Sequence, residues 1–146
     1  MSNNQFKRGE LYSVINGMAT TAVARRLQKN FRNAGLEITI EQWSVLYHLW
    51  KEDGLSQLEL GNRTFRDKAS TTRLIDNLEK QELVTRVASK DDRRINLVYL
   101  TDIAKPLQQI TYELANKTMN ESLQNISKEE IEVVKNVLQR VYDNLT

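Results

Sequence analysis

The segment DKASTTRLIDNLEK, residues 67–80, concentrates hydrogen-bond donors at its start. Ser and Thr are unfavourable inside helices because their hydroxyl groups compete for backbone hydrogen bonds. Such side chains can instead contact the bases and phosphates of DNA, and Arg can chelate guanine O6 and N7. The candidate DNA contacts of this segment are Lys68, Ser70, Thr72, Arg73 and Asn77. A solvated helix surface is the alternative interpretation.

The periodicity of this segment separates packing residues from contact residues. At about 100° per residue, an apolar stripe of Leu74, Ile75 and Leu78 forms, and Thr71 shares its face. We therefore predict that Thr71 packs, with its hydroxyl group bonded to a backbone carbonyl. A DNA contact by Thr71 is the alternative.

A second basic cluster, KDDRR at residues 90–94, lies between two runs that favour β-structure. The run from Val84 to Val87 is β-branched, and the run from Ile95 to Tyr99 alternates in the period of a strand. These patterns predict a two-stranded hairpin. Its tip adds three candidate DNA contacts, Lys90, Arg93 and Arg94.

Helix signals place both clusters within a mostly helical chain. The apolar spacing over residues 7–33 predicts one long helix, with Gly17 as a tolerated weak point and Gly35 after its end. Capping residues predict where the later helices begin. These helices start after Thr39, Ser56, Asp67, Thr101 and Ser127. Pro106 then falls in the first turn of a helix, where proline is tolerated.

Two short capped helices followed by a hairpin are the order of a winged helix-turn-helix, whose later helix enters the DNA major groove. The predicted fold class is mainly α with a small β-hairpin wing. Residues 1–146 form a single unit, in which residues 38–101 are the DNA-binding region. Residues 7–33 and 102–146 supply the remaining helices.

The last predicted helix carries an apolar seam at alternating steps of three and four. Its members are Ile131, Val134, Leu138, Val141 and Leu145. This spacing favours contact with a partner helix over an ordinary amphipathic surface helix. Together with Leu11 and Ile15, the seam predicts a homodimer built by residues 7–33 and 102–146. Such a dimer presents two recognition helices to half-sites about one DNA turn apart.

Composition limits the function classes. Residues 63–94 carry nine Lys and Arg against six Asp and Glu, although the whole chain has a net charge of only +2, so a polyanionic partner is indicated. With no Cys, one His and no catalytic motif, we expect neither an enzyme nor a metal or other cofactor. The chain also lacks a long apolar segment or signal core, so we expect a cytoplasmic protein that does not enter membranes.

The stretches STTRLIDNLEKQELVTR and DDRRINLVYLT resemble the recognition helix and wing of the multiple antibiotic resistance regulator (MarR) family of bacterial repressors. The resemblance covers nearly the whole chain. It implies that Arg94 reaches the minor groove and that Asp92 orients a wing arginine. The chain departs from the family pattern at Phe65, Arg66 and Ala104, and we expect Phe65 to fill the small core beside the turn.

The resemblance also implies a small aromatic or lipophilic acid as an effector. Candidate pocket residues are Tyr12, Met18, Trp43, Tyr47 and Trp50, for which plain core packing is the alternative. The sequence therefore predicts a homodimeric repressor that binds a pseudopalindromic operator in double-stranded DNA. A winged-helix module that binds other proteins is the alternative function.

Overall fold

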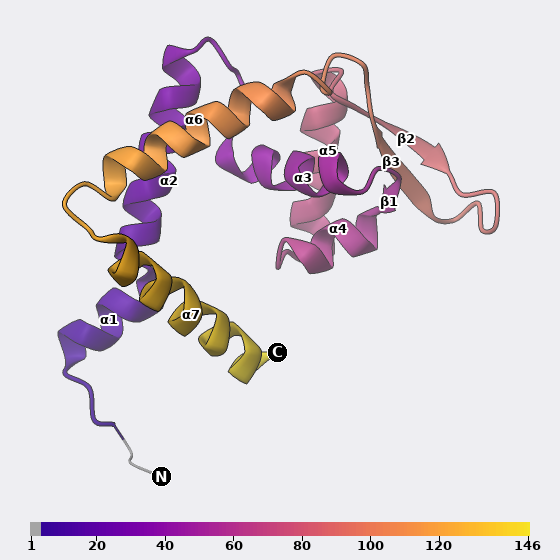
Figure 1. Cartoon of the computed structure of the whole chain (residues 1–146). Helices are drawn as coiled ribbons and strands as arrows, with labels where there is room; N and C mark the ends of the chain where they lie inside the picture. The colour runs from indigo at the N-terminus through magenta and orange to yellow at the C-terminus, as the bar shows by residue number, and fades with distance from the viewer. Residues whose placement is uncertain (1–3) are drawn as a thin grey trace.

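The long first helix predicted from the sequence is broken at Gly17. The computed structural model describes residues 4–146 and contains α1 (Arg8–Asn16) and α2 (Met18–Asn33) in its place (Figure 1). Gly17 has φ 59° and ψ 50°, a left-handed conformation in which glycine avoids the steric cost of a Cβ. A right-handed helix cannot pass through that conformation, so the prediction of one continuous helix is wrong.

Three short helices form the helix-turn-helix half of the chain. They are α3 (Ile40–Lys51), α4 (Gln57–Arg63) and α5 (Lys68–Lys80). Capping boxes at Thr39 and Ser56 begin α3 and α4. At the start of α5, the Asp67 carboxylate accepts a hydrogen bond from the Ser70 backbone N–H at 2.7 Å. The predicted caps of all three helices are confirmed.

The hairpin belongs to a three-stranded antiparallel sheet in the order β1-β3-β2. Its strands are β1 (Leu55–Ser56), β2 (Val84–Ala88) and β3 (Asn96–Leu100). The predicted hairpin is confirmed, and β2, β3 and their connection are the wing (residues 84–100). Strand β1 escaped prediction because two residues are too short to show an alternating pattern.

The helix after the wing begins later than predicted. Residues 102–106 form turns, and α6 (Leu107–Ser122) starts only after Pro106. The Thr101 hydroxyl group donates to the Glu82 carbonyl at 2.7 Å, so it links the end of β3 to the segment after α5. Thr101 therefore closes the wing and does not cap a helix.

The last helix, α7 (Lys128–Leu145), starts at the predicted capping box of Ser127 and Glu130. None of its described residues is buried in the protomer, and its central Leu138 is 63% exposed. Figure 1 shows α1 and the start of α7 at the end of the molecule remote from the wing, from where α7 runs back toward the side of α4. An amphipathic helix with an exposed apolar stripe needs a further surface to cover it.

The core joins α2 and α3 to α5 and the sheet, with Phe31, Leu46 and Ile75 fully buried. Phe65 is not part of this core, because the residue is 76% exposed. Its ring packs edge-to-face with the Tyr142 ring of α7, at a centroid distance of 6.2 Å. Its φ of 56° places it in the left-handed region. That turn directs the side chain outward, so the expectation that Phe65 fills the core is wrong.

Close packing beside the turn depends instead on Gly61 of α4. A Cβ at this position would lie 2.9 Å from Thr71 Oγ1 and 3.2 Å from the Arg66 carbonyl oxygen. Gly61→Ala should therefore lower the free energy of unfolding by about 1–3 kcal/mol, the usual cost of overpacking. Denaturant unfolding of the variant and parent checks this value.

Gly9 provides the matched control, because it is also helical and a Cβ there meets nothing within 4 Å. Gly9→Ala should raise the free energy of unfolding by less than about 1 kcal/mol through helix propensity, because Gly9 is only the second residue of α1. If Gly61→Ala stabilises the protein as much as Gly9→Ala does, the contact between α4 and α5 is looser than the structure indicates.

Candidate nucleic-acid interface

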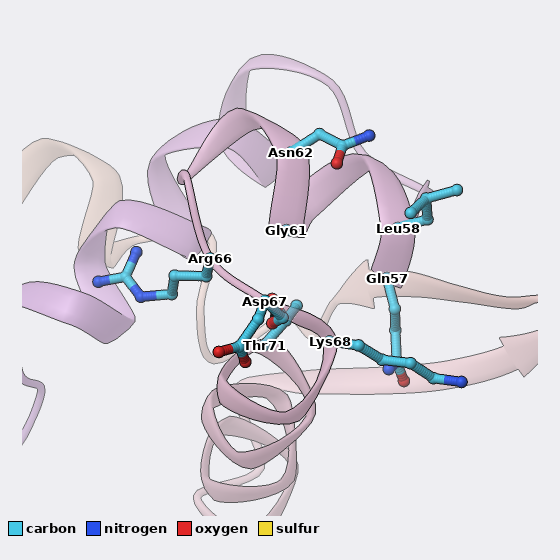
Figure 2. Close-up of a pocket in the computed structure, with 8 residues that line it drawn as sticks. All are labelled: Gln57, Leu58, Gly61, Asn62, Arg66, Asp67, Lys68 and Thr71. Atoms are coloured by element: carbon cyan, nitrogen blue, oxygen red, sulfur yellow. Dashed lines mark hydrogen bonds between the residues drawn. The ribbon is translucent and has the colours of Figure 1, made fainter.

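The start of α5, the predicted recognition helix, presents an exposed row of polar side chains. Lys68, Arg73 and Asn77 are exposed, and Ser70 is half-buried on the flank. In Figure 2, Lys68 extends outward from the first turn of α5, whereas Thr71 lies between α5 and α4. The helix therefore offers ammonium and guanidinium groups from its first two turns and an amide group from Asn77 in its third turn.

The two central threonines of this run have different roles. Thr71 is 2% exposed, and its hydroxyl group donates to the Asp67 carbonyl at 2.8 Å, so the packing prediction is confirmed. The Thr72 hydroxyl donates to the Lys68 carbonyl at 2.8 Å and accepts from Gln57 Nε2 at 3.3 Å. Because its proton is used within α5, Thr72 is suited to contact a thymine methyl group rather than to donate to a base.

A groove of about 450 Å³ lies between α4 and the start of α5 (Figure 2). Its lining residues are Gln57, Leu58, Gly61, Asn62, Arg66, Asp67, Lys68 and Thr71. Arg66 extends away from Lys68 and donates to Ser44 Oγ at 3.4 Å and to the Thr64 carbonyl at 3.2 Å. Arg66 therefore supports the turn between α4 and α5. Asn62 is exposed and adds a polar group to the groove, which the sequence analysis did not identify.

A side-chain hydrogen bond shapes the wing tip. The Asp92 carbonyl accepts from the Ile95 N–H at 3.0 Å, which closes a turn, and Asp92 Oδ1 accepts from the Arg94 N–H at 3.0 Å. Asp commonly occupies this turn position because its carboxylate can bond to the backbone two residues later. The charged run at residues 90–94 is thus a defined turn.

Asp92 also holds the Arg94 side chain. Its two carboxylate oxygens accept from Arg94 Nε and Nη2, both at 3.1 Å. These hydrogen bonds, followed by the one from the Arg94 backbone N–H, lower the pKa of Asp92 below its ordinary value. The Arg94 side chain nevertheless stays 90% exposed, and Lys90 and Arg93 are exposed beside it. The structure therefore brings the side chains of Asp92 and Arg94 together, as predicted. Their contact with DNA stays a prediction.

The sequence analysis overlooked Arg86 in β2. Its side chain is only 16% exposed and reaches Asp76 and Glu79 of α5. Strand alternation could have identified it, because Arg86 shares the inward face with buried Val84. A charged residue at an inward strand position requires partners.

A second cavity, of about 650 Å³, lies between α3 and α6. We call it the aromatic cavity, and its lining residues are Trp43, Tyr47, Trp50, Lys51, Lys105, Pro106, Gln108, Gln109, Thr111, Tyr112 and Ala115. The structure thus brings together three of the five predicted pocket residues. Tyr12 and Met18 do not line this cavity, because the residues that face α3 there come from α6 and the segment just before it.

Solved structures with the same fold include DNA-binding regulators. A mutant MarR from E. coli complexed with operator DNA is 21% identical, with a TM-score of 0.83 over 95% of this chain and 99% of that chain. BpsR of Bordetella bronchiseptica, whose DNA binding is regulated by 6-hydroxynicotinic acid, is 19% identical, with a TM-score of 0.83 over 96% and 99%. Within residues 4–146, no helix is long and apolar enough to cross a membrane.

Sequence similarity to known proteins identifies the family of this chain. The transcriptional regulator PA3341 is 30% identical to this chain, with a TM-score of 0.76 over 92% of this chain and 97% of that chain. The profile of the MarR family matches residues 38–95, which contain α3, the recognition helix and most of the wing. The chain therefore belongs to the MarR family, which consists of transcriptional regulators.

Proposed function

We propose that this protein is a homodimeric repressor that binds a pseudopalindromic operator in double-stranded DNA. The main supporting observation is that exposed hydrogen-bond donors on α5 lie next to the wing. The tip of the wing presents Arg94, which is exposed and bound to Asp92. A helix can read base edges in the major groove, and an arginine hairpin can reach the adjacent minor groove. Repression follows when the bound protein blocks access of the transcription machinery to the promoter.

The dimer is proposed to form through residues 7–33 and 102–146. The predicted seam residues of α7 lie at the protomer surface, with half-buried Ile131 at one end and exposed Leu145 at the other. On α1, Leu11 and Ile15 are also exposed, Ile15 at 77%. Covering both surfaces with a second copy would remove apolar area from water, which is the main driving force of association.

Selection of genomic fragments with the purified full-length protein, followed by footprinting, tests this function. The expected footprint contains two related half-sites whose centres are about one DNA turn apart. Enrichment of no fragment, at low as well as physiological salt, would contradict operator binding. That outcome would favour the winged-helix module that binds proteins.

The aromatic cavity is the proposed effector site. Trp43, Trp50 and Tyr112 give it apolar walls, and its lining includes the cations Lys51 and Lys105, of which Lys105 also pairs with Asp102 at 3.1 Å. This combination suits an aromatic carboxylate, whose ring packs on the indoles while its charge faces ammonium groups. Because the cavity lies between a helix of the DNA-binding half and α6, a ligand there could favour a recognition-helix separation that does not fit the operator.

Tryptophan fluorescence should report on this site, because the only two Trp residues of the chain both line the cavity. Titration with 2-hydroxybenzoate should change the emission saturably and weaken operator binding. The double variant Lys51→Met and Lys105→Met should bind this acid several-fold more weakly, while leaving affinity for uncharged 2-hydroxybenzyl alcohol nearly unchanged. Equal losses for both compounds would contradict recognition of the carboxylate by these lysines.

A further inference from the structure

Arg86 connects the wing to α4 and to the recognition helix α5, using all three nitrogens of its guanidinium group. Nη2 lies 2.7 Å from Asp76 Oδ1, and Nη1 lies 3.2 Å from Glu79 Oε1. Nε donates to Gln57 Oε1 at 2.7 Å, which adds α4 to the cluster. The Arg86 backbone N–H also donates to Glu79 Oε2 at 3.1 Å. One residue near the base of the wing is therefore bound to both helices of the helix-turn-helix.

The hydrogen bonds continue from Arg86 to the end of α5 that carries the candidate DNA contacts. Gln57 accepts from Arg86 and donates to Thr72 Oγ1, and the Thr72 hydroxyl donates to the Lys68 carbonyl. Arg86 Nη2 also approaches the Thr72 carbonyl at 3.4 Å. The same network therefore contacts the wing and the first two turns of the recognition helix.

The position of Arg86 near the base of a hairpin makes its contacts important for the tip. At the rise of an extended strand the tip lies roughly 15 Å from Arg86, so a tilt of about 10° at this residue moves it by about 2.5 Å. A displacement of that size is enough to break hydrogen bonds between the tip and DNA, because the distance between donor and acceptor atoms can vary by only a few tenths of an ångström. Arg94, 90% exposed at the tip, would lose its alignment with the DNA.

We infer that Arg86 is a positioning residue, which fixes the wing on the recognition helix so that Arg94 and the side chains of α5 contact DNA together. This inference rests on the proposed DNA-binding function. The guanidinium fork is needed for it, because a lysine ammonium in its place would keep the charge but could not hold Asp76, Glu79 and Gln57 in fixed directions.

An electrostatic role is the simpler alternative. Without Arg86, the carboxylates of Asp76 and Glu79 would be uncompensated on the helix that approaches the phosphates. Their repulsion would weaken DNA binding whether or not Arg94 is present. A positioning role instead makes the contribution of Arg94 depend on Arg86, so a double-mutant cycle separates the two explanations.

The cycle uses the parent, Arg86→Met, Arg94→Ala and the double variant, each bound to the selected operator as full-length protein. Arg94→Ala should weaken binding about tenfold per half-site in the parent, as expected for one lost charge-assisted contact on each wing, and less than about twofold per half-site in Arg86→Met. Arg86→Lys should reduce the Arg94 contribution similarly. Equal losses in the parent and in Arg86→Met, or an Arg86→Lys variant that behaves like the parent, would overturn the inference.

Two controls show that the recognition helix remains intact. Arg73→Ala should have the same effect in the parent and in Arg86→Met, because Arg73 belongs to α5 and not to the wing. Thermal unfolding by circular dichroism should show a cooperative transition for each variant. If Arg86→Met does not fold, the cycle is carried out with Arg86→Lys, which retains the cation.

A measurement without DNA separates this inference from the proposed function. The chain contains no Cys, so spin labels can be attached through Lys80→Cys on α5 and Lys90→Cys on the wing. With a large excess of unlabelled protein, the distance distribution within one protomer should be narrow in the parent and broader in Arg86→Met and Arg86→Lys. Unchanged distributions would overturn the positioning role, whereas a parent that binds no operator would overturn only the proposed function.

Discussion

Leu138→Glu is expected to convert the protein into monomers and to weaken operator binding at least about a hundredfold. Leu138 lies in the middle of the α7 seam, exposed in the protomer and proposed to be covered by the partner. An unpaired carboxylate buried in an apolar interface costs several kcal/mol, and 1.4 kcal/mol corresponds to a factor of ten. Light scattering and operator titration measure the two effects.

Asn136→Glu is the matched control for this prediction. It adds the same charge to the same helix, two residues from Leu138 and therefore on nearly the opposite side. The control should remain dimeric and bind the operator with an affinity close to that of the parent. A parent that is monomeric at micromolar concentration would exclude the proposed dimer, whatever the variants do.

The elements of the DNA-binding half could be predicted because their start signals are local. Thr39, Ser56 and Asp67 each bond to backbone N–H groups within three residues, so the sequence contains both partners of each contact. The burial of Thr71 followed from helical periodicity for the same reason. Contacts that close within one turn depend little on the remainder of the fold.

The features that escaped prediction depend on long-range contacts or on backbone conformation. Arg86 meets Gln57, which is 29 residues away in the chain, and no local pattern specifies that pair. The direction of the Phe65 side chain follows from a left-handed φ that sequence alone does not assign to a bulky aromatic residue. The sequence marks Gly17 as a weak point of the first helix, but it does not specify the left-handed conformation that breaks the helix there.

Only part of the candidate pocket could be predicted from the sequence. Helical spacing shows which residues share one face of a helix, but it does not show which other helix packs against that face. Trp43, Tyr47 and Trp50 share α3 and line the aromatic cavity together. Their facing residues, including Tyr112, come from α6, whereas α1 and the start of α2 lie elsewhere. Packing between distant helices determines this choice.

Arg73→Ala and Arg94→Ala should have different effects on sequence preference and salt dependence. Arg73 projects from the recognition helix, so its removal should cost about 1–3 kcal/mol per half-site and relax preference at one or two base pairs if it chelates guanine. Arg94 lies on the wing, so its removal should weaken binding to most sequences and lower the salt slope by about one per wing. Competition against a randomised operator library at two salt concentrations measures both effects.

Two further variants isolate the cause of these losses. Arg25→Ala, on the exposed surface of α2, removes an arginine outside the candidate interface and should leave the library preference unchanged. Asp92→Asn keeps Arg94 but removes the charged partner that orients it, so its affinity should lie between those of the parent and Arg94→Ala. Because A·T-rich minor grooves are narrow and strongly negative, preference for A·T-rich flanks should decrease in the same order. If Arg94→Ala binds like the parent at both salt concentrations, the wing does not contact DNA.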